Sequence, residues 1–97
     1  KDVKEFNKSA LYWYNKIAHS INSSNIDKAD NYYISLKSEH IQSPLLQTAI
    51  MMLANAHMNE EEYLLANFYF DEYKKRYGEN KNREYIDFMK LKASFMG

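Results

Sequence analysis

The chain has 97 residues, and its 13 basic and 13 acidic side chains give a formal net charge of zero, which excludes the strong positive field expected of a nucleic-acid-binding protein. A composition with 45% hydrophobic residues, two Gly, one Pro and no Cys favours a small all-α domain and excludes a disulfide framework. No apolar run is long enough to cross a membrane.

The first predicted helix follows a charged segment. Residues 1–8, KDVKEFNK, have no apolar periodicity and are predicted to be a flexible lead-in. A helix is expected from about Ser9 to Ser23, because apolar residues recur there at steps of three and four. Either Asn7 or Ser9 would cap it, and the polar run 22–25 would end it.

The second and third predicted helices are separated by a turn that contains the only proline. The second should run from about Ile26 to Ser38. The third should run from about Pro44 to Met58, with Ser43 as its cap and Pro44 in its first turn.

Two further helices complete the predicted elements. The fourth should span about Glu61 to Tyr77 and stop at Gly78. Its start lies beside three consecutive glutamates, residues 60–62, whose negative charge complements a helix N-terminus. The fifth should begin near Asn82 and run to the end of the chain.

The helices repeat at a spacing of 37 residues. This shift aligns Ala29 with Ala66 and Tyr33 with Phe70, as in the tetratricopeptide pattern, where a small residue lets two antiparallel helices approach. The first helix of the first repeat departs from that pattern except at Trp13. An unrelated helical bundle is the alternative interpretation.

The repeat pattern predicts an all-α fold of tetratricopeptide-like α-hairpin repeats, forming a short right-handed solenoid of about five helices. Residues 9–97 would form this repeat domain. The predicted divisions are repeat 1 at about 9–41, repeat 2 at about 43–78 and half of repeat 3 at about 82–97.

A peptide-binding groove is predicted on the concave face, which the first helix of each repeat lines. Positions stepped at 37 residues along this face are mostly apolar or aromatic, and the methionine thioether adapts to varied partners. Ordinary helix core is the alternative interpretation of the same stripe. The predicted groove residues are Leu11, Tyr14, Ile21, Met51, Asn55, Met58, Tyr85, Phe88, Lys92 and Phe95.

Catalytic and metal-binding constellations are not recognisable. The three histidines, His19, His40 and His57, are far apart in the chain, and only His57 has a carboxylate one turn on, at Glu61. Zinc needs three or four ligands, so no metal site is predicted. Without a Gly-rich phosphate loop or a nucleophile with its base, we expect no cofactor and no enzymatic activity.

Four segments in order resemble the BamD/ComL family of outer-membrane β-barrel assembly lipoproteins, most closely its Helicobacter and Campylobacter members. The likeness covers residues 9–97. The segments are ALYWYNKI (10–17), KADNYYISLKSEH (28–40), SPLLQTAIMMLANAHM (43–58) and EEYLLANFYFDEYKKRYG (61–78).

The resemblance implies a location and a function. Family members lie on the periplasmic face of the outer membrane, held by a lipid anchor on an N-terminal cysteine that this sequence lacks. The chain would be an N-terminal fragment, and its implied partners are unfolded outer-membrane proteins and other subunits of the assembly machine. Asn55 and Lys92 would lie near the terminal carboxylate of a substrate. The alternative is a scaffold that docks neighbouring subunits of a cell-envelope complex.

Overall fold

A computed structural model of the chain describes residues 7–78 and 83–96. Most of the predicted flexible lead-in and the predicted start of the fifth helix at Asn82 lie outside the described residues. No helix within the described ranges is both long and apolar enough to span a membrane.

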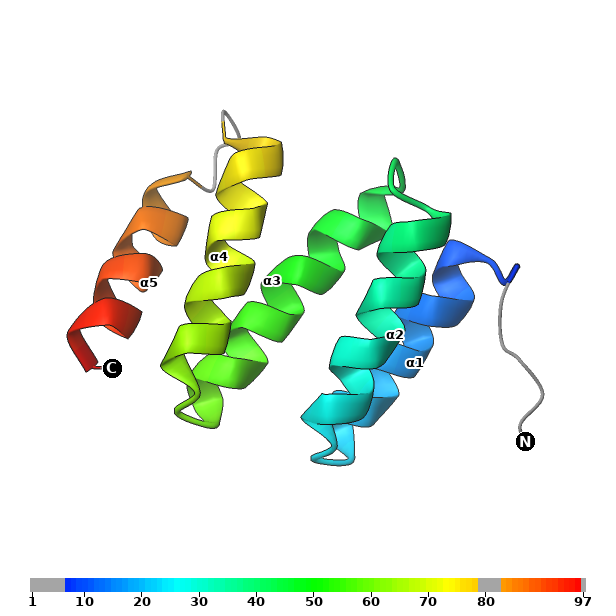
Figure 1. Ribbon diagram of the computed structural model, residues 1–97, viewed down its shortest axis with the longest axis horizontal. Helices are drawn as coiled ribbons and strands as arrows, with labels where there is room; N and C mark the ends of the chain where they lie inside the picture. The colour runs from blue at the N-terminus through cyan, green and yellow to red at the C-terminus, as the bar shows by residue number, and fades with distance from the viewer. Residues whose placement is uncertain (1–6, 79–82, 97) are drawn as a thin grey trace. The chain divides into compact units, whose positions relative to one another are not determined.

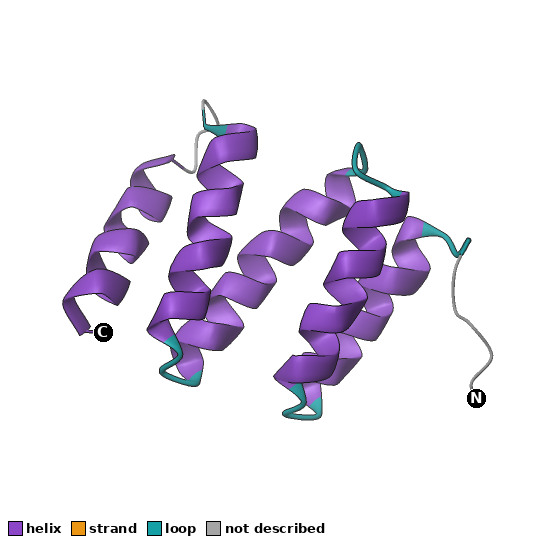
Figure 2. Ribbon diagram, viewed as in Figure 1, coloured by secondary structure: helices purple, strands orange, loops and turns teal. Residues whose placement is uncertain are grey.

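The described residues form helices and connecting turns, with no strand among them (Figure 2). The predicted all-α, tetratricopeptide-like class is confirmed, and the ends of the first four helices lie within two residues of their predicted positions. The helices are α1 (Ala10–Asn22), α2 (Ile26–Glu39), α3 (Pro44–Asn59), α4 (Tyr63–Tyr77) and α5 (Arg83–Met96).

Local side chains set the helix starts. The Ser9 hydroxyl accepts a hydrogen bond from the Tyr12 amide at 3.0 Å, so Ser9 is the N-cap of α1. The Asn25 side chain caps α2 in the same way. At α3, the Ser43 hydroxyl accepts from the Leu45 amide at 3.1 Å.

Gly78 ends α4 as expected, but for a different physical reason. Its φ of −58° lies in the right-handed region, so the left-handed freedom of glycine is not used. A Cβ at this position would lie 2.7 Å from the Lys74 carbonyl oxygen. Glycine is favoured at this position because any larger residue would bring its Cβ too close to that carbonyl oxygen.

The chain divides into two compact units, 1–49 and 50–97, with the boundary inside α3. In the first unit, α1 and α2 run antiparallel and pack along each other (Figure 1). Its buried apolar residues are Trp13, Ile17, Ala29, Tyr33, Leu36, Leu46 and Ala49.

In the second unit, α4 lies beside α5 (Figure 1). Ala54 and Ala66 are fully buried, and Phe70 is 1% exposed, as expected for a helical hairpin that is closely packed through small residues. The other buried residues of this unit are Ile50, Leu53, Ala56, His57, Tyr69, Tyr73, Ile86 and Ala93.

The α1–α2 turn and the α3–α4 turn have the same backbone structure at the 37-residue spacing. Ser24 and Glu61 occupy the left-handed region, with φ of 62° and 61°. Asn25 and Glu62 each donate a backbone hydrogen bond of 2.8 Å, to the carbonyls of Ser20 and His57 respectively. This equivalence supports the repeat spacing. The repeat boundaries and the right-handed superhelix stay predictions.

Candidate functional site

A pocket of about 510 Å³ lies in the second unit. It includes three of the predicted groove residues, Asn55, Met58 and Lys92. Its full lining is Asn55, Met58, Asn59, Glu61, Tyr63, Met89, Lys92 and Met96, contributed by the C-terminal part of α3, the turn that follows it, the start of α4 and α5.

Asn55 presents hydrogen-bond donors at this pocket. Its Oδ1 accepts a hydrogen bond of 3.0 Å from the hydroxyl of Tyr85, another predicted groove residue. This bond occupies the amide oxygen, so the two N–H groups of Asn55 are left for a ligand. An acceptor such as a carboxylate oxygen fits that arrangement.

Two exposed charged side chains of opposite sign line the pocket. Lys92 comes from α5 and Glu61 from the α3–α4 turn. Neither is ion-paired within residues 7–78 and 83–96. Lys92 attracts an anionic ligand group and Glu61 repels one, so the two charges partly offset each other in the pocket.

The apolar part of the lining is rich in methionine. Met58 comes from α3, and Met89 and Met96 come from α5. Unbranched thioether side chains fill irregular gaps and contact aromatic rings favourably. Polar and charged side chains outnumber the methionines in the lining, so the pocket is mainly polar with an adaptable apolar part.

The other predicted groove residues lie outside this pocket. On α5, Phe88 is 61% exposed and Phe95 is 90% exposed, while Met51 on α3 is half-buried. Leu11, Tyr14 and Ile21 lie on α1 in the first unit and are also at least partly exposed. None of the predicted groove residues is fully buried.

His57 pairs with Glu62 and not with Glu61, the carboxylate that lies one turn on in the sequence. Its Nδ1 lies 2.7 Å from an oxygen of Glu62, not of Glu61, and its ring stacks on Tyr69 with 5.6 Å between centroids. Glu61 takes the left-handed position of the turn and lines the pocket, whereas Glu62 is the N-cap residue of α4. His57 is only 1% exposed, so this pair links α3 to α4 inside the second unit.

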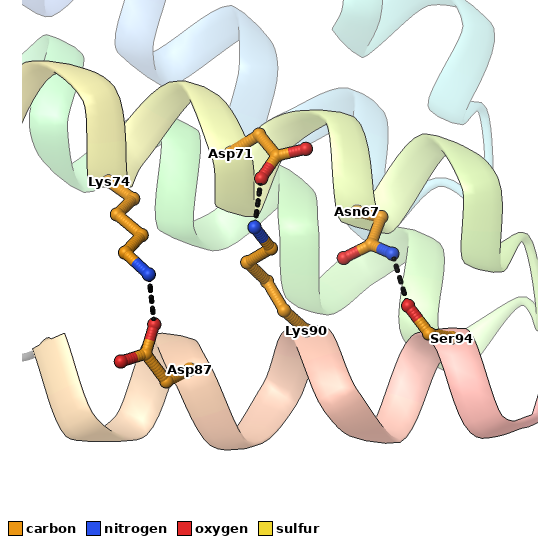
Figure 3. A network of polar contacts seen from close by, with 6 residues as sticks. All are labelled: Asn67, Asp71, Lys74, Asp87, Lys90 and Ser94. Atoms are coloured by element: carbon orange, nitrogen blue, oxygen red, sulfur yellow. Dashed lines mark hydrogen bonds and ion pairs between the residues drawn. The ribbon is translucent and has the colours of Figure 1, made fainter.

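A row of polar contacts holds α5 against α4, as Figure 3 shows. Exposed pairs of this kind contribute at most about 1 kcal/mol each, but a row of them fixes the position of one helix along the other. The row thereby positions the α5 residues of the pocket. The contacts are Asn67 to Ser94 at 3.0 Å, Lys74 to Asp87 at 2.7 Å, and the Asp71–Lys90 ion pair.

Comparison with known proteins identifies the family. A family model described as "YfiO: Outer membrane lipoprotein" matches residues 6–96. The chain belongs to the YfiO family of outer membrane lipoproteins. It is 50% identical over 95 residues to a Helicobacter pylori protein named "Outer membrane protein assembly factor BamD". That match covers 98% of this chain and 43% of the relative. No solved structure matches the chain significantly.

Membership in the YfiO family confirms the resemblance read from the four sequence segments, and it supports localisation at the outer membrane. The chain spans less than half the length of the relative from Helicobacter pylori.

The groove prediction missed pocket residues that helical spacing could have found. Met89 and Met96 lie three residues before and four residues after Lys92, so they share its side of α5. The prediction selected positions 37 residues apart. It therefore omitted residues three or four positions away on the same helix face. Tyr63 and Glu61 come from the turn and the start of α4, which a rule restricted to the first helix of each repeat cannot reach.

Proposed function

We propose that this YfiO-family chain is a non-enzymatic protein-binding module of the outer-membrane β-barrel assembly machinery, and that it receives unfolded outer-membrane proteins. The observation that carries the proposal is the pocket that combines methionines with Asn55 and Lys92. The name of the relative, an outer membrane protein assembly factor, supports the same process.

The proposed ligand is the C-terminal segment of an unfolded barrel protein. Barrel strands alternate apolar and polar residues, so an extended segment presents an apolar side chain at every second position. A terminal aromatic ring would contact Met58, Met89 and Met96, and the terminal carboxylate would accept hydrogen bonds from Asn55 and Lys92. Binding and release of such a segment involve no covalent step.

Exposed aromatic residues outside the pocket extend the proposed binding surface. Phe88 and Phe95 offer α5 contacts for apolar residues farther from the peptide end. Aromatic side chains bury a large area, so a few of them can contribute much of the binding free energy.

The test replaces Met58 with glutamate in the 97-residue chain. Met58→Glu places a negative charge at the apolar wall, so we expect it to weaken capture of a peptide with an alternating aromatic end while the helical circular-dichroism signal is unchanged. Ile34→Glu is the matched control, because Ile34 is 63% exposed on α2 and lies outside the pocket. Equal capture by the Met58→Glu variant and the unmodified chain would count against the proposed site.

The second candidate function is a scaffold that docks folded neighbouring subunits. Phe88, Leu91 and Phe95 are all exposed and lie at steps of three and four, so they form one apolar face of α5. A scaffold would bind folded partner domains through this face and would be indifferent to extended peptides. The same peptide titration therefore separates the two candidates.

A further inference from the structure

A second cavity, of about 270 Å³, lies in the first unit between the end of α1 and the start of α2. Its α1 residues lie on the helix that departs from the tetratricopeptide pattern. The proposed peptide site does not include this cavity. Among its lining residues are Lys16, His19, Ser20, Ser23, Lys28 and Tyr32.

The cavity occupies the place where the second repeat has its buried histidine. In that repeat an imidazole fills the space, pairs with a carboxylate and stacks on a tyrosine ring. In the first repeat the imidazole is replaced by a hydroxymethyl group and the carboxylate by an amide. The positions related by 37 residues are Ser20 and His57, Asn25 and Glu62, and Tyr32 and Tyr69.

Two cations replace two apolar residues around the same space. Lys16 corresponds to Leu53 and Lys28 to Leu65 at the 37-residue spacing. No carboxylate is ion-paired with either lysine in the part of the chain that the structure describes, and none lines the cavity. At these positions the first repeat therefore lacks the acid of the second repeat and has two lysines where the second has leucines.

Lys16 is held in position by aromatic rings. Its Nζ lies 5.4 Å from the ring centroid of Tyr12 and 6.0 Å from that of Tyr32. The α1 C-terminus and the α2 N-terminus meet here, and their opposite partial charges offset each other. The lysines that line the cavity are Lys16 and Lys28.

Hydroxyl and amide groups add uncharged donors. Ser20 is only 4% exposed yet lines the cavity, and no hydrogen bond of its hydroxyl is seen among the described residues. The Asn25 side-chain oxygen accepts from the Lys28 amide, so its N–H₂ group is left for a ligand.

We propose that this cavity binds a phosphate group. Two lysines, two serines and an asparagine line the space from both helices, and a tetrahedral anion can accept hydrogen bonds from several directions at once. A planar carboxylate would use fewer of these donors. The phosphate group belongs either to the headgroup of an anionic lipid or to a soluble phosphate compound.

The test follows amide resonances of the 97-residue chain during a titration with inorganic phosphate, with sodium chloride of matched ionic strength as the reference. We expect saturable shifts at Ser20, Ser23 and Lys28. Lys28→Gln should weaken phosphate binding about fivefold, as loss of one exposed charge contact predicts. Lys75→Gln removes an equal charge from α4 and should leave binding unchanged. Ser20→His should block binding by filling the cavity, as His57 does in the second repeat.

Vesicles then distinguish the two sources. Capture of the chain by phosphatidylglycerol vesicles but not phosphatidylcholine vesicles, lost in Lys28→Gln, would assign the site to an anionic lipid. Phosphate binding without vesicle capture would assign it to a soluble phosphate compound. The proposal is overturned if phosphate produces no saturable shifts at these residues. It is also overturned if Lys75→Gln weakens binding as much as Lys28→Gln, because the attraction would then be diffuse.

Discussion

Opposite charge changes at the proposed peptide pocket should have opposite effects on peptide affinity. Lys92→Gln removes the positive side chain and should weaken binding of a peptide with a free C-terminal carboxylate. Glu61→Gln removes the negative side chain from the same lining and should strengthen it. Both effects should vanish for the same peptide with a C-terminal amide.

The exposure of both side chains limits the magnitude of these effects. Two unit charges about 5 Å apart in a medium like water interact by about 0.8 kcal/mol. Measured values for exposed pairs fall in the same range, about 0.2–1 kcal/mol. Each substitution should therefore change the dissociation constant by about fourfold at low ionic strength, and by less at physiological salt.

The assay is a fluorescence-anisotropy titration of the unmodified chain and the two variants with the acid and amide peptides. Lys75→Gln, which removes a charge outside the pocket, is the control. Equal changes for acid and amide peptides would refute the assignment of Lys92 to the carboxylate. If Lys92→Gln and Glu61→Gln changed the affinity in the same direction, the claim that their opposite charges act on the peptide carboxylate would be refuted.

Three further predictions concern stability. The pKa of Glu39 is lowered from its ordinary value of 4.5, mainly because the carboxylate accepts a hydrogen bond from the Trp13 indole. Ionised Glu39 should therefore stabilise the fold above about pH 4.5, and this stabilisation should be lost as the pH falls through the lowered pKa. In urea unfolding, Glu39→Gln should lose less stability in acid than the unmodified chain does. His57→Ala removes a buried ring and its pairing, and should cost about 2–4 kcal/mol in the free energy of unfolding, against under about 0.5 kcal/mol for exposed His19→Ala. Gly78→Ala should destabilise α4 by about 1 kcal/mol, measured as a lower unfolding midpoint, because the added Cβ meets a backbone carbonyl oxygen.

Each stability prediction has a contradicting outcome. If Glu39→Gln lost as much stability in acid as the unmodified chain, the Trp13 contact would not stabilise the folded state. Equal losses for the His57 and His19 variants would contradict the buried pairing in the second unit. A Gly78→Ala variant as stable as the unmodified chain would mean that the end of α4 relaxes without cost.

Helix positions were predictable because their signals are local. Ser9 as a cap and Pro44 in a first turn mark helix starts from a few neighbouring residues, and the structure has α1 and α3 beginning there. The left-handed turn positions were not predictable in the same way. Ser24 and Glu61 share a backbone conformation but no side-chain chemistry, so only the backbone reveals their equivalence.

Contacts between distant residues were the least predictable. The Trp13 indole donates to Glu39 across 26 positions, and the Tyr85 hydroxyl donates to Asn55 across 30 positions. No periodic pattern encodes such a pair. The pocket was predicted in part, because Asn55, Met58 and Lys92 lie on the faces that the 37-residue spacing selects, whereas Glu61 reaches it from a turn.

Reception of an unfolded outer-membrane protein segment is the central claim, and a peptide titration tests it most directly. The chain would be titrated with a fluorescent peptide of about ten residues, the length of a barrel strand, that alternates and ends in an aromatic residue. A scrambled peptide of the same composition is the control. Saturable binding of the ordered peptide, much tighter than that of the scrambled one, is the predicted result. Equal or absent binding of the two peptides would contradict the claim and favour the docking scaffold.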